Sequence, residues 1–321
     1  MPNDIPGFRE AVEALRTAER ILVAGHVGPD GDALGSMLAF AHSARAAGRE
    51  AWASFGEPFV LASQFDFLDT APLVPPTQLP DDVDLFVAVD TAAPERLGSL
   101  AAAAAAAGRV LVVDHHRSNG GFGDVVLVDP HAGATTQLVY HLLVALDWPI
   151  DKSVATALYT GLVTDTGRFQ YSSTSPDVHE VAAALLDVGV QPDQVGQRLF
   201  EEAPFAYYGV VAAVMSRSVL EADHGLVWSV LYRDDLVRHN ITYEETDALI
   251  DLVRIAREAD VACLLKEVEE GVYKGSLRSR GRVDVSAIAQ VLGGGGHHNA
   301  AGFTFAGPAD EAIAAVRSLL S

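Results

Sequence analysis

The chain has 321 residues, of which 43 are acidic and 22 are basic, so its formal net charge is −21. This length predicts about two domains that each bury a core, which excludes a miniprotein stabilised by disulfides or by one metal. Cys263 is the single cysteine, so the chain forms no internal disulfide. The acidic charge argues against long nucleic acids, duplexes included, bound in a broad basic groove, because such binding depends on Lys and Arg.

No hydrophobic segment of the sequence indicates a membrane protein. Residues 1–15 lack a basic stretch that leads into an apolar one, and no apolar run approaches the roughly 18 residues of a spanning helix. We therefore expect a soluble, cytoplasmic protein without membrane contact.

The first half of the chain alternates apolar strand patterns with helical ones. Strands are predicted at 21–26 (ILVAGH), 84–90 (DLFVAVD), 109–116 (RVLVVDHH) and 125–130. Helices are predicted at 32–47, 101–107, 134–146 and 152–166. Continuous Val, Leu and Ile runs are typical of strands buried on both faces. The pattern predicts an α/β domain whose mainly parallel sheet is covered by helices.

The pattern changes near residue 190. A proline-bracketed helix over 189–205 is predicted to link a catalytic domain (1–188) to a substrate-binding domain (206–321). Strands are expected at 226–232, 260–268 and 272–280, the last two forming a hairpin, with helices at 243–258, 284–292 and 309–320. These elements indicate a smaller, mixed α/β domain.

A tight loop after the first strand carries His26, Asp30 and Asp32 in the string HVGPDGDALGS. Imidazole and carboxylate groups so closely spaced suit a divalent cation, and the two carboxylates could serve neighbouring ions. The alternative is structural: Asp32 caps the following helix and Asp30 stabilises the turn.

Three further polar segments follow apolar elements. Asp90 ends one strand, the triplet Asp114, His115 and His116 ends another, and Asp165 ends a helix before a glycine turn. The carboxyl ends of parallel strands meet at one sheet edge, so these groups should gather there. The predicted metal ligands are His26, Asp30, Asp32, Asp90, His115 and Asp165. Two ions held this way form a clamp for phosphoryl chemistry, and the absence of Cys favours Mn²⁺ or Mg²⁺ over structural zinc.

The second domain contains a glycine run, Gly293 to Gly296, followed by His297 and Asn299. Glycines allow backbone N–H groups to approach an anion, although such runs are often only flexible connectors. Arg278 and Arg280 flank Ser279 on a predicted strand, and we expect Arg278 to contact a phosphate or base and Arg280 to be solvated.

Taken in order, HVGPDGDALGS, Asp90, the DHH triplet and VTDTGRFQYSSTS resemble the DHH phosphoesterase superfamily, while GGGGHHNAAG and LRSR resemble a DHHA1 domain. The combination resembles the NrnA-type subgroup, nanoRNA exonucleases that also dephosphorylate 3′-phosphoadenosine 5′-phosphate (pAp). The resemblance implies two Mn²⁺ ions, with Mg²⁺ or Co²⁺ as substitutes. It places one ion at His26, Asp30 and Asp90 and the other at Asp32, Asp90, His115 and Asp165.

The same resemblance implies roles for the remaining residues. Asp90 bridges the ions, His116 faces the scissile phosphate, and Asp114 orients a neighbour by hydrogen bonding. The substrate-binding residues are Arg278, Ser279, Gly295, Gly296, His297 and Asn299. The expected substrates are pAp, dinucleotides such as pApA and short single-stranded RNA or DNA, cleaved to mononucleotides. The oligomeric state is left open, with a homodimer possible.

Two other functions are compatible with parts of the sequence. The N-terminal motifs are similar to those of manganese inorganic pyrophosphatases, although the glycine-rich ending argues against that activity. A nucleotide-binding sensor or RNA-binding module would rely on the second domain alone, which the complete set of predicted ligands argues against.

Overall fold

The computed structural model describes residues 5–320 and leaves the His297 side chain undescribed. The chain divides into two compact units, Met1–Glu201 and Glu202–Ser321. The division falls inside the predicted linker, at the end of helix α7 (Pro192–Phe200). Within the described part of the chain, no helix combines the length and the hydrophobicity needed to cross a membrane.

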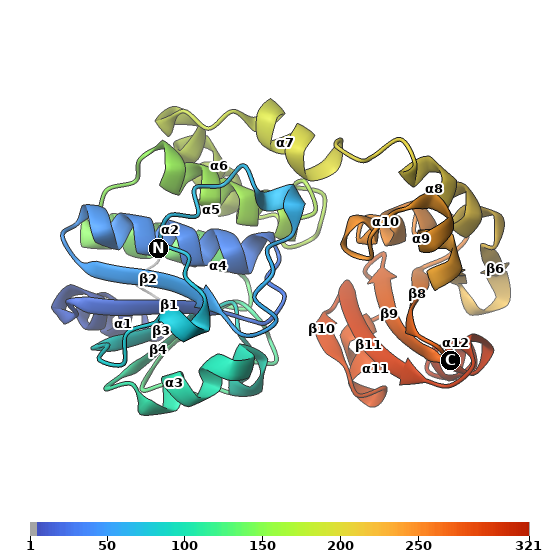
Figure 1. The fold of residues 1–321 in the computed structure, drawn as a ribbon, viewed down its shortest axis with the longest axis horizontal. Helices are drawn as coiled ribbons and strands as arrows, with labels where there is room; N and C mark the ends of the chain where they lie inside the picture. Colours follow the sequence, from blue (N-terminus) through green and yellow to red (C-terminus); the bar gives the residue numbers. More distant parts are fainter. Residues whose placement is uncertain (1–4, 321) are drawn as a thin grey trace. The chain divides into compact units, whose positions relative to one another are not determined.

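The first unit is built on a parallel five-stranded sheet with the order β2-β1-β3-β4-β5 (Figure 1). Its strands are β1 (Arg20–Gly25), β2 (Glu50–Phe55), β3 (Leu85–Val89), β4 (Val110–Asp114) and β5 (Val125–Val128). The central strand β3 is buried along its whole length, as its unbroken apolar sequence predicts. The predicted α/β class is therefore confirmed.

Helices cover both faces of this sheet. The larger core packs one face against α1 (Phe8–Thr17), α2 (Gly31–Ala46), α4 (Thr135–Leu146) and α5 (Lys152–Asp165), with α6 (Pro176–Val188) outside them. The other face packs on a 3₁₀ segment (Pro94–Leu100) and on α3 (Ala101–Ala106). Alternate strand residues point to opposite faces, so Leu22 and Phe86 face α3 while Ile21 and Val87 face the larger core.

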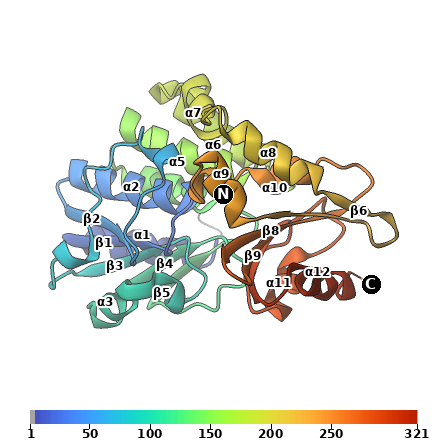
Figure 2. The same ribbon diagram turned by 45° about the vertical axis from the view of Figure 1, so that its right-hand side comes forward.

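The second unit contains a mixed six-stranded sheet, ordered β10-β11-β9-β8-β7-β6. Figure 2 shows its paired strands β8 and β9. The strands are β6 (Val219–Glu221), β7 (Leu226–Leu231), β8 (Val261–Glu269), β9 (Val272–Ser279), β10 (Gly295–His297) and β11 (Ala300–Ala306). One face packs on α11 (Val285–Val291) and α12 (Ala309–Ser318). The other packs on α8 (Tyr207–Ser216), α9 (Arg233–His239) and α10 (Leu249–Val253).

Most predicted elements of the second unit occur, including the hairpin of β8 and β9, which pair antiparallel. The predicted helix at 243–258 is wrong: the chain makes a 3₁₀ turn at Glu244–Thr246 and the five-residue α10 there. Strands β2, β6, β10 and β11 and helices α1, α6, α8 and α9 were not predicted. Strand β10 passes through the glycine run, where a side chain at Gly294 or Gly296 would collide with β11. These two glycines are therefore required for strand packing.

Candidate metal centre

The carboxyl ends of three parallel strands supply the polar side chains of the candidate site. His26 follows β1, Asp90 follows β3, and Asp114, His115 and His116 follow or end β4. Asp90 has a positive φ of 51°. A non-glycine residue in the left-handed region carries local strain, which is typical of functional positions. The predicted meeting of these groups at one sheet edge is what the fold produces.

Helix α2 begins beside this edge and contributes two aspartates. Asp30 is the N-cap, and its Oδ1 accepts hydrogen bonds from the N–H groups of Asp32 and Ala33, each at 3.0 Å. The other oxygen, Oδ2, lies 3.7 Å from His26 Nε2. Asp30 therefore caps the helix, as the structural alternative predicts, and still presents one oxygen to the site.

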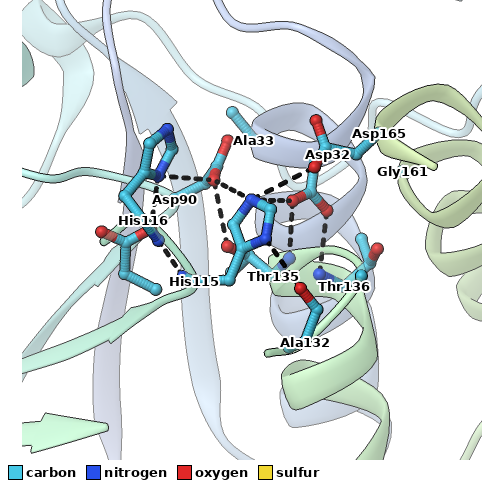
Figure 3. Close-up of polar contacts among 12 residues, drawn as sticks. Asp32, Ala33, Asp90, His115, His116, Ala132, Thr135, Thr136, Gly161 and Asp165 are labelled. Carbon is cyan, nitrogen blue, oxygen red and sulfur yellow. Dashed lines mark hydrogen bonds and ion pairs between the residues drawn. The ribbon is translucent and has the colours of Figure 1, made fainter. Parts of the chain in front are cut away.

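Asp32 is almost fully buried, with 1% of its surface exposed. Its two carboxylate oxygens accept hydrogen bonds from the backbone N–H groups of Thr135 (2.6 Å) and Thr136 (2.9 Å) at the start of α4 (Figure 3). The N-terminus of a helix favours a carboxylate because its N–H groups and dipole are positive there. Thus α4 positions Asp32, a role that the sequence analysis missed.

Helix α5 brings Asp165 to the same place by crossing α2 closely. A Cβ at Gly35 would collide with the backbone of Ala157, and one at Gly161 would collide with Thr136 and approach Asp32. The absence of both side chains allows the close approach. Asp165, the last residue of α5, places Oδ2 3.2 Å from His115 Nε2.

The two predicted histidine ligands are held in the same way. Nδ1–H of His26 donates to the carbonyl of Val27 at 3.1 Å, and Nδ1–H of His115 donates to that of Ala132 at 3.2 Å. This arrangement turns each Nε2 toward the carboxylates. A backbone partner on one imidazole nitrogen is the usual support of a histidine whose other nitrogen binds a metal.

Ligand atoms gather into overlapping groups, each with all its atoms within 4.8 Å of one another. The groups are His26, Asp30 and Asp90; Asp32, His115 and Asp165; and Asp90, His115 and His116. Thus all six predicted ligands lie in one cluster, with Asp90 near both histidine ligands, since its oxygens are 3.7 Å from His26 Nε2 and His115 Nε2.

The electrostatics of the cluster indicate an incomplete balance of charge. Burial and the neighbouring Asp90 raise the pKa of Asp32 to about 7, and burial and Asp30 raise that of Asp90 to about 6. Burial also raises the pKa of Asp165 to about 7. Burial alone would lower the pKa of His115, but Asp165, Asp32 and Asp90 raise it to about 9. Crowded carboxylates retain protons because like charges repel, and divalent cations relieve that repulsion.

His116 also takes part in a series of hydrogen bonds with Asp114 and Asn119. Its Nδ1–H donates to Asp114 Oδ1 at 2.7 Å, and the other oxygen of Asp114 accepts from Asn119 Nδ2 at 2.6 Å. Burial alone would raise the pKa of Asp114, but hydrogen bonds from His116 and Asn119 lower it. The hydrogen bonds from His116 and Asn119 thus stabilise the ionised carboxylate of Asp114, which in turn orients His116. Asn119, which stands five residues after Asp114 in a Gly-rich turn, was not predicted.

The predicted substrate residues lie in the second unit, on and around β9. Arg278 is partly buried; its Nη1 donates to the carbonyl of Leu277 at 3.1 Å, and its buried Nε has no hydrogen-bond partner among the described residues. Arg280 is exposed and donates to the carbonyls of Arg254 and Ile255. Ser279 Oγ accepts from Gly281 N–H, so it supports a turn.

Of the other residues predicted to bind substrate, some take part in strand packing and one borders open space. A side chain at Gly295 would meet nothing within 4 Å, although its backbone pairs with Gly302 of β11, whereas a side chain at Gly296 would meet Ala300 and Ala301. The carbonyl of Asn299 accepts from the N–H of Ser279. The predicted contact of His297 lies outside the described side chains.

Comparisons with known proteins match both parts of the chain to known domains. Residues 20–162 match the N-terminal domain of the DHH family, and residues 223–321 match the DHHA1 domain. The chain is 36% identical over 306 residues to the Thermus thermophilus protein named bifunctional oligoribonuclease and PAP phosphatase NrnA, covering 94% of this chain and 89% of the relative.

Two solved structures extend the comparison to the fold. An exopolyphosphatase-related protein from Bacteroides fragilis superposes with a TM-score of 0.89 at 23% identity, covering 98% of this chain and 95% of that one. RecJ from Thermus thermophilus, solved in complex with Mn²⁺, has a TM-score of 0.56 at 14% identity, covering 99% of this chain and 55% of RecJ. With both domains matched and a relative similar along nearly its whole length, this chain belongs to the DHH/DHHA1 phosphoesterase superfamily, in its NrnA-type subgroup.

Proposed function

We propose that this protein is a two-metal phosphoesterase that cleaves short oligonucleotides and dinucleotides such as pApA to mononucleotides, and removes the 3′-phosphate of pAp. The observation that carries the proposal is that the six predicted ligands form two adjoining groups: His26, Asp30 and Asp90, and Asp32, His115 and Asp165. The name of the Thermus relative, an oligoribonuclease and PAP phosphatase, supports the same substrates. We assign catalysis to residues 1–188 and substrate binding to residues 206–321, joined by the linker at 189–205.

The donor set fits divalent ions that accept both oxygen and nitrogen ligands. His26, Asp30 and Asp90 would hold one ion, and Asp32, Asp90, His115 and Asp165 the other. Mn²⁺ is our choice, with Mg²⁺ or Co²⁺ as substitutes. When bound, such ions supply positive charge that neutralises a phosphate group and makes an attacking water more acidic.

The protein's own residues supply orientation and proton transfer. Asp114 holds His116 by Nδ1, which directs the opposite edge of the imidazole away from Asp114. We assign His116 to the scissile phosphate, where it donates a hydrogen bond or a proton to the leaving oxygen. In the second unit, Arg278 contributes a guanidinium suited to a phosphate or base edge.

A single hydrolysis panel tests this function. The purified protein is first treated with chelator, then supplied with Mn²⁺, and offered pAp, pApA, RNAs of two to five nucleotides and pyrophosphate, with products separated by chromatography. We expect mononucleotides and inorganic phosphate only when Mn²⁺ or a comparable ion is present. Hydrolysis confined to pyrophosphate, or full turnover without metal, would contradict the proposal.

A further inference from the structure

A short segment at the start of α4, Ala132–Thr136, contacts three of the proposed metal ligands at once. The Ala132 carbonyl accepts from His115 Nδ1, and the N–H groups of Thr135 and Thr136 donate to Asp32. The Thr135 hydroxyl donates to Asp90 Oδ1 at 3.0 Å. A displacement of this segment would therefore disturb His115, Asp32 and Asp90 together (Figure 3).

Gln137, the third residue of α4, holds this segment from the first turn of the helix. It is 5% exposed, and its Oε1 accepts from the N–H of Gly133 at 2.7 Å. Ala134, the N-cap of α4, makes no side-chain hydrogen bond to the helix. Because the N-cap residue is an alanine, it offers no capping side chain at this end of α4. The Gln137 side chain instead accepts the hydrogen bond of the Gly133 N–H.

The other end of Gln137 is anchored on a different helix. Its Nε2 donates to Asp177 Oδ2 on α6, and His141 Nε2 lies 2.8 Å from the same oxygen. Burial alone would raise the pKa of Asp177, but hydrogen bonds from His141 and Gln137 lower it. Asp177 is thus an ionised anchor that orients the amide of Gln137, fixing which end faces Gly133.

Resting on the proposed function, we propose that Gln137 is a positioning residue for metal binding, which acts through the segment Ala132–Thr136 and is itself oriented by Asp177. Gln137 contacts no proposed ligand directly. Its effect passes through four hydrogen bonds to three ligands, all made by one short segment. Groups that orient metal ligands typically change metal affinity by about 10- to 100-fold when removed.

The test measures Mn²⁺ binding to chelator-treated protein by calorimetry, without substrate. Gln137→Ala is compared with Gln194→Ala, in which an exposed glutamine of α7 is removed. We expect Gln137→Ala to weaken at least one Mn²⁺ site by about 10- to 100-fold. Gln194→Ala should bind as wild type does.

A reversed pair separates orientation from general stability. Gln137→Glu keeps an acceptor for Gly133 but places a carboxylate against Asp177, so binding should weaken. The double variant Q137E/D177N exchanges donor and acceptor across the same contact and should recover most of the affinity. A merely structural role would lower the unfolding temperature of the metal-free protein and leave Mn²⁺ affinity unchanged.

The outcomes are distinct. Wild-type Mn²⁺ affinity in Gln137→Ala, or a double variant no better than Q137E, would overturn the positioning role while the two-metal function stands. A wild-type protein that binds no Mn²⁺ would overturn the proposed function itself, and the positioning role with it. Recovery by the double variant supports both.

Discussion

The two units bury carboxylates in opposite electrostatic surroundings: beside other carboxylates in the first unit and beside an arginine in the second. In the first unit, Asp32 and Asp90 lie near other carboxylates, and burial with these neighbours raises their pKa values to about 7 and 6. In the second unit, Asp235 receives two hydrogen bonds from Arg217, at 2.5 and 2.7 Å. Burial alone would raise the pKa of Asp235, but the bonds from Arg217 and from the Tyr232 backbone lower it.

This difference separates structural charges from functional ones. Buried Lys266 of the second unit likewise has Asp247 at 2.5 Å, so the chain itself supplies the counter-charge. In the metal centre the counter-charge is insufficient, which leaves the carboxylates dependent on protons or on cations from solution. A cluster of buried like charges is thus a stronger indication of a ligand site than burial or an ion pair alone.

The largest effect is expected at Asp90, which lies in the middle of the unbalanced cluster. Asp90→Asn should lower kcat/KM for pAp by about 1,000-fold, because the amide loses the charge that would attract both ions. Asparagine tolerates the positive φ at this position, so the fold should persist. Exposed Asp187→Ala is the matched control. Activity near the wild-type level would show that Asp90 only ends its strand.

The second prediction concerns the metal-free protein. In chelator, the free energy of unfolding of the first unit should fall by at least about 3 kcal/mol between pH 5 and pH 9, because each unit of raised pKa within this range contributes about 1.4 kcal/mol. The raised pKa values of Asp32, Asp90 and Asp165 mean that the folded state keeps protons which the unfolded chain has lost above pH 4. Burial alone would lower the pKa values of His26 and His115, but neighbouring carboxylates raise both to about 9. These histidines act in the same direction above pH 6.5.

The second unit supplies the contrast, because the lowered pKa of Asp235 gives stability that is lost only at lower pH. In a Trp228→Phe variant, the fluorescence of Trp52 and Trp148 follows urea unfolding of the first unit alone. Excess Mn²⁺ should abolish or reverse the decline, because cations replace protons. A stability that is constant from pH 5 to 9 in chelator would refute the unbalanced-charge interpretation.

The third prediction separates the roles of the two units. Arg278→Ala should raise KM for pAp and pApA by a factor corresponding to about 1.5–3 kcal/mol of lost charge-assisted bonding, with Mn²⁺ affinity unchanged. A small phosphodiester that lacks a nucleoside should be much less affected. Arg280→Ala, just after the end of β9, is the control. Equal loss on both substrates, with the fold intact, would place Arg278 in the chemistry.

How far the sequence predicts these features depends on what positions each group. His26, Asp90 and His115 follow apolar strands, so the topology of a parallel sheet is enough to bring them together. Thr135 and Thr136 act on Asp32 through backbone N–H groups, which any residue provides, so their role has no sequence signature. The helix expected at 243–258 is wrong because apolar spacing alone does not distinguish one long helix from the 3₁₀ turn at Glu244–Thr246 and the five-residue α10 that the chain forms.

The smallest effect is expected from a variant that tests Asp114, a carboxylate of the candidate metal centre whose pKa is lowered and not raised. Asp114 lies among the unbalanced carboxylates, yet hydrogen bonds from His116 and Asn119 lower its pKa, as Arg217 does for Asp235. Asp114 should therefore orient His116 without binding metal. Asn119→Ala removes the 2.6 Å bond to Asp114 and a 3.1 Å bond to the Thr91 carbonyl, which loosens His116.

We expect Asn119→Ala to lower kcat by about tenfold, the lower end of the range for groups that orient a functional side chain. KM and calorimetric Mn²⁺ affinity should be unchanged, because neither Asn119 nor Asp114 is assigned as a ligand. The pH profile of kcat should also shift, since the partner of Asp114 would titrate in a different environment. Weakened Mn²⁺ binding with unchanged kcat at saturating metal would place Asp114 among the ligands and remove the distinction between balanced and unbalanced carboxylates at this site.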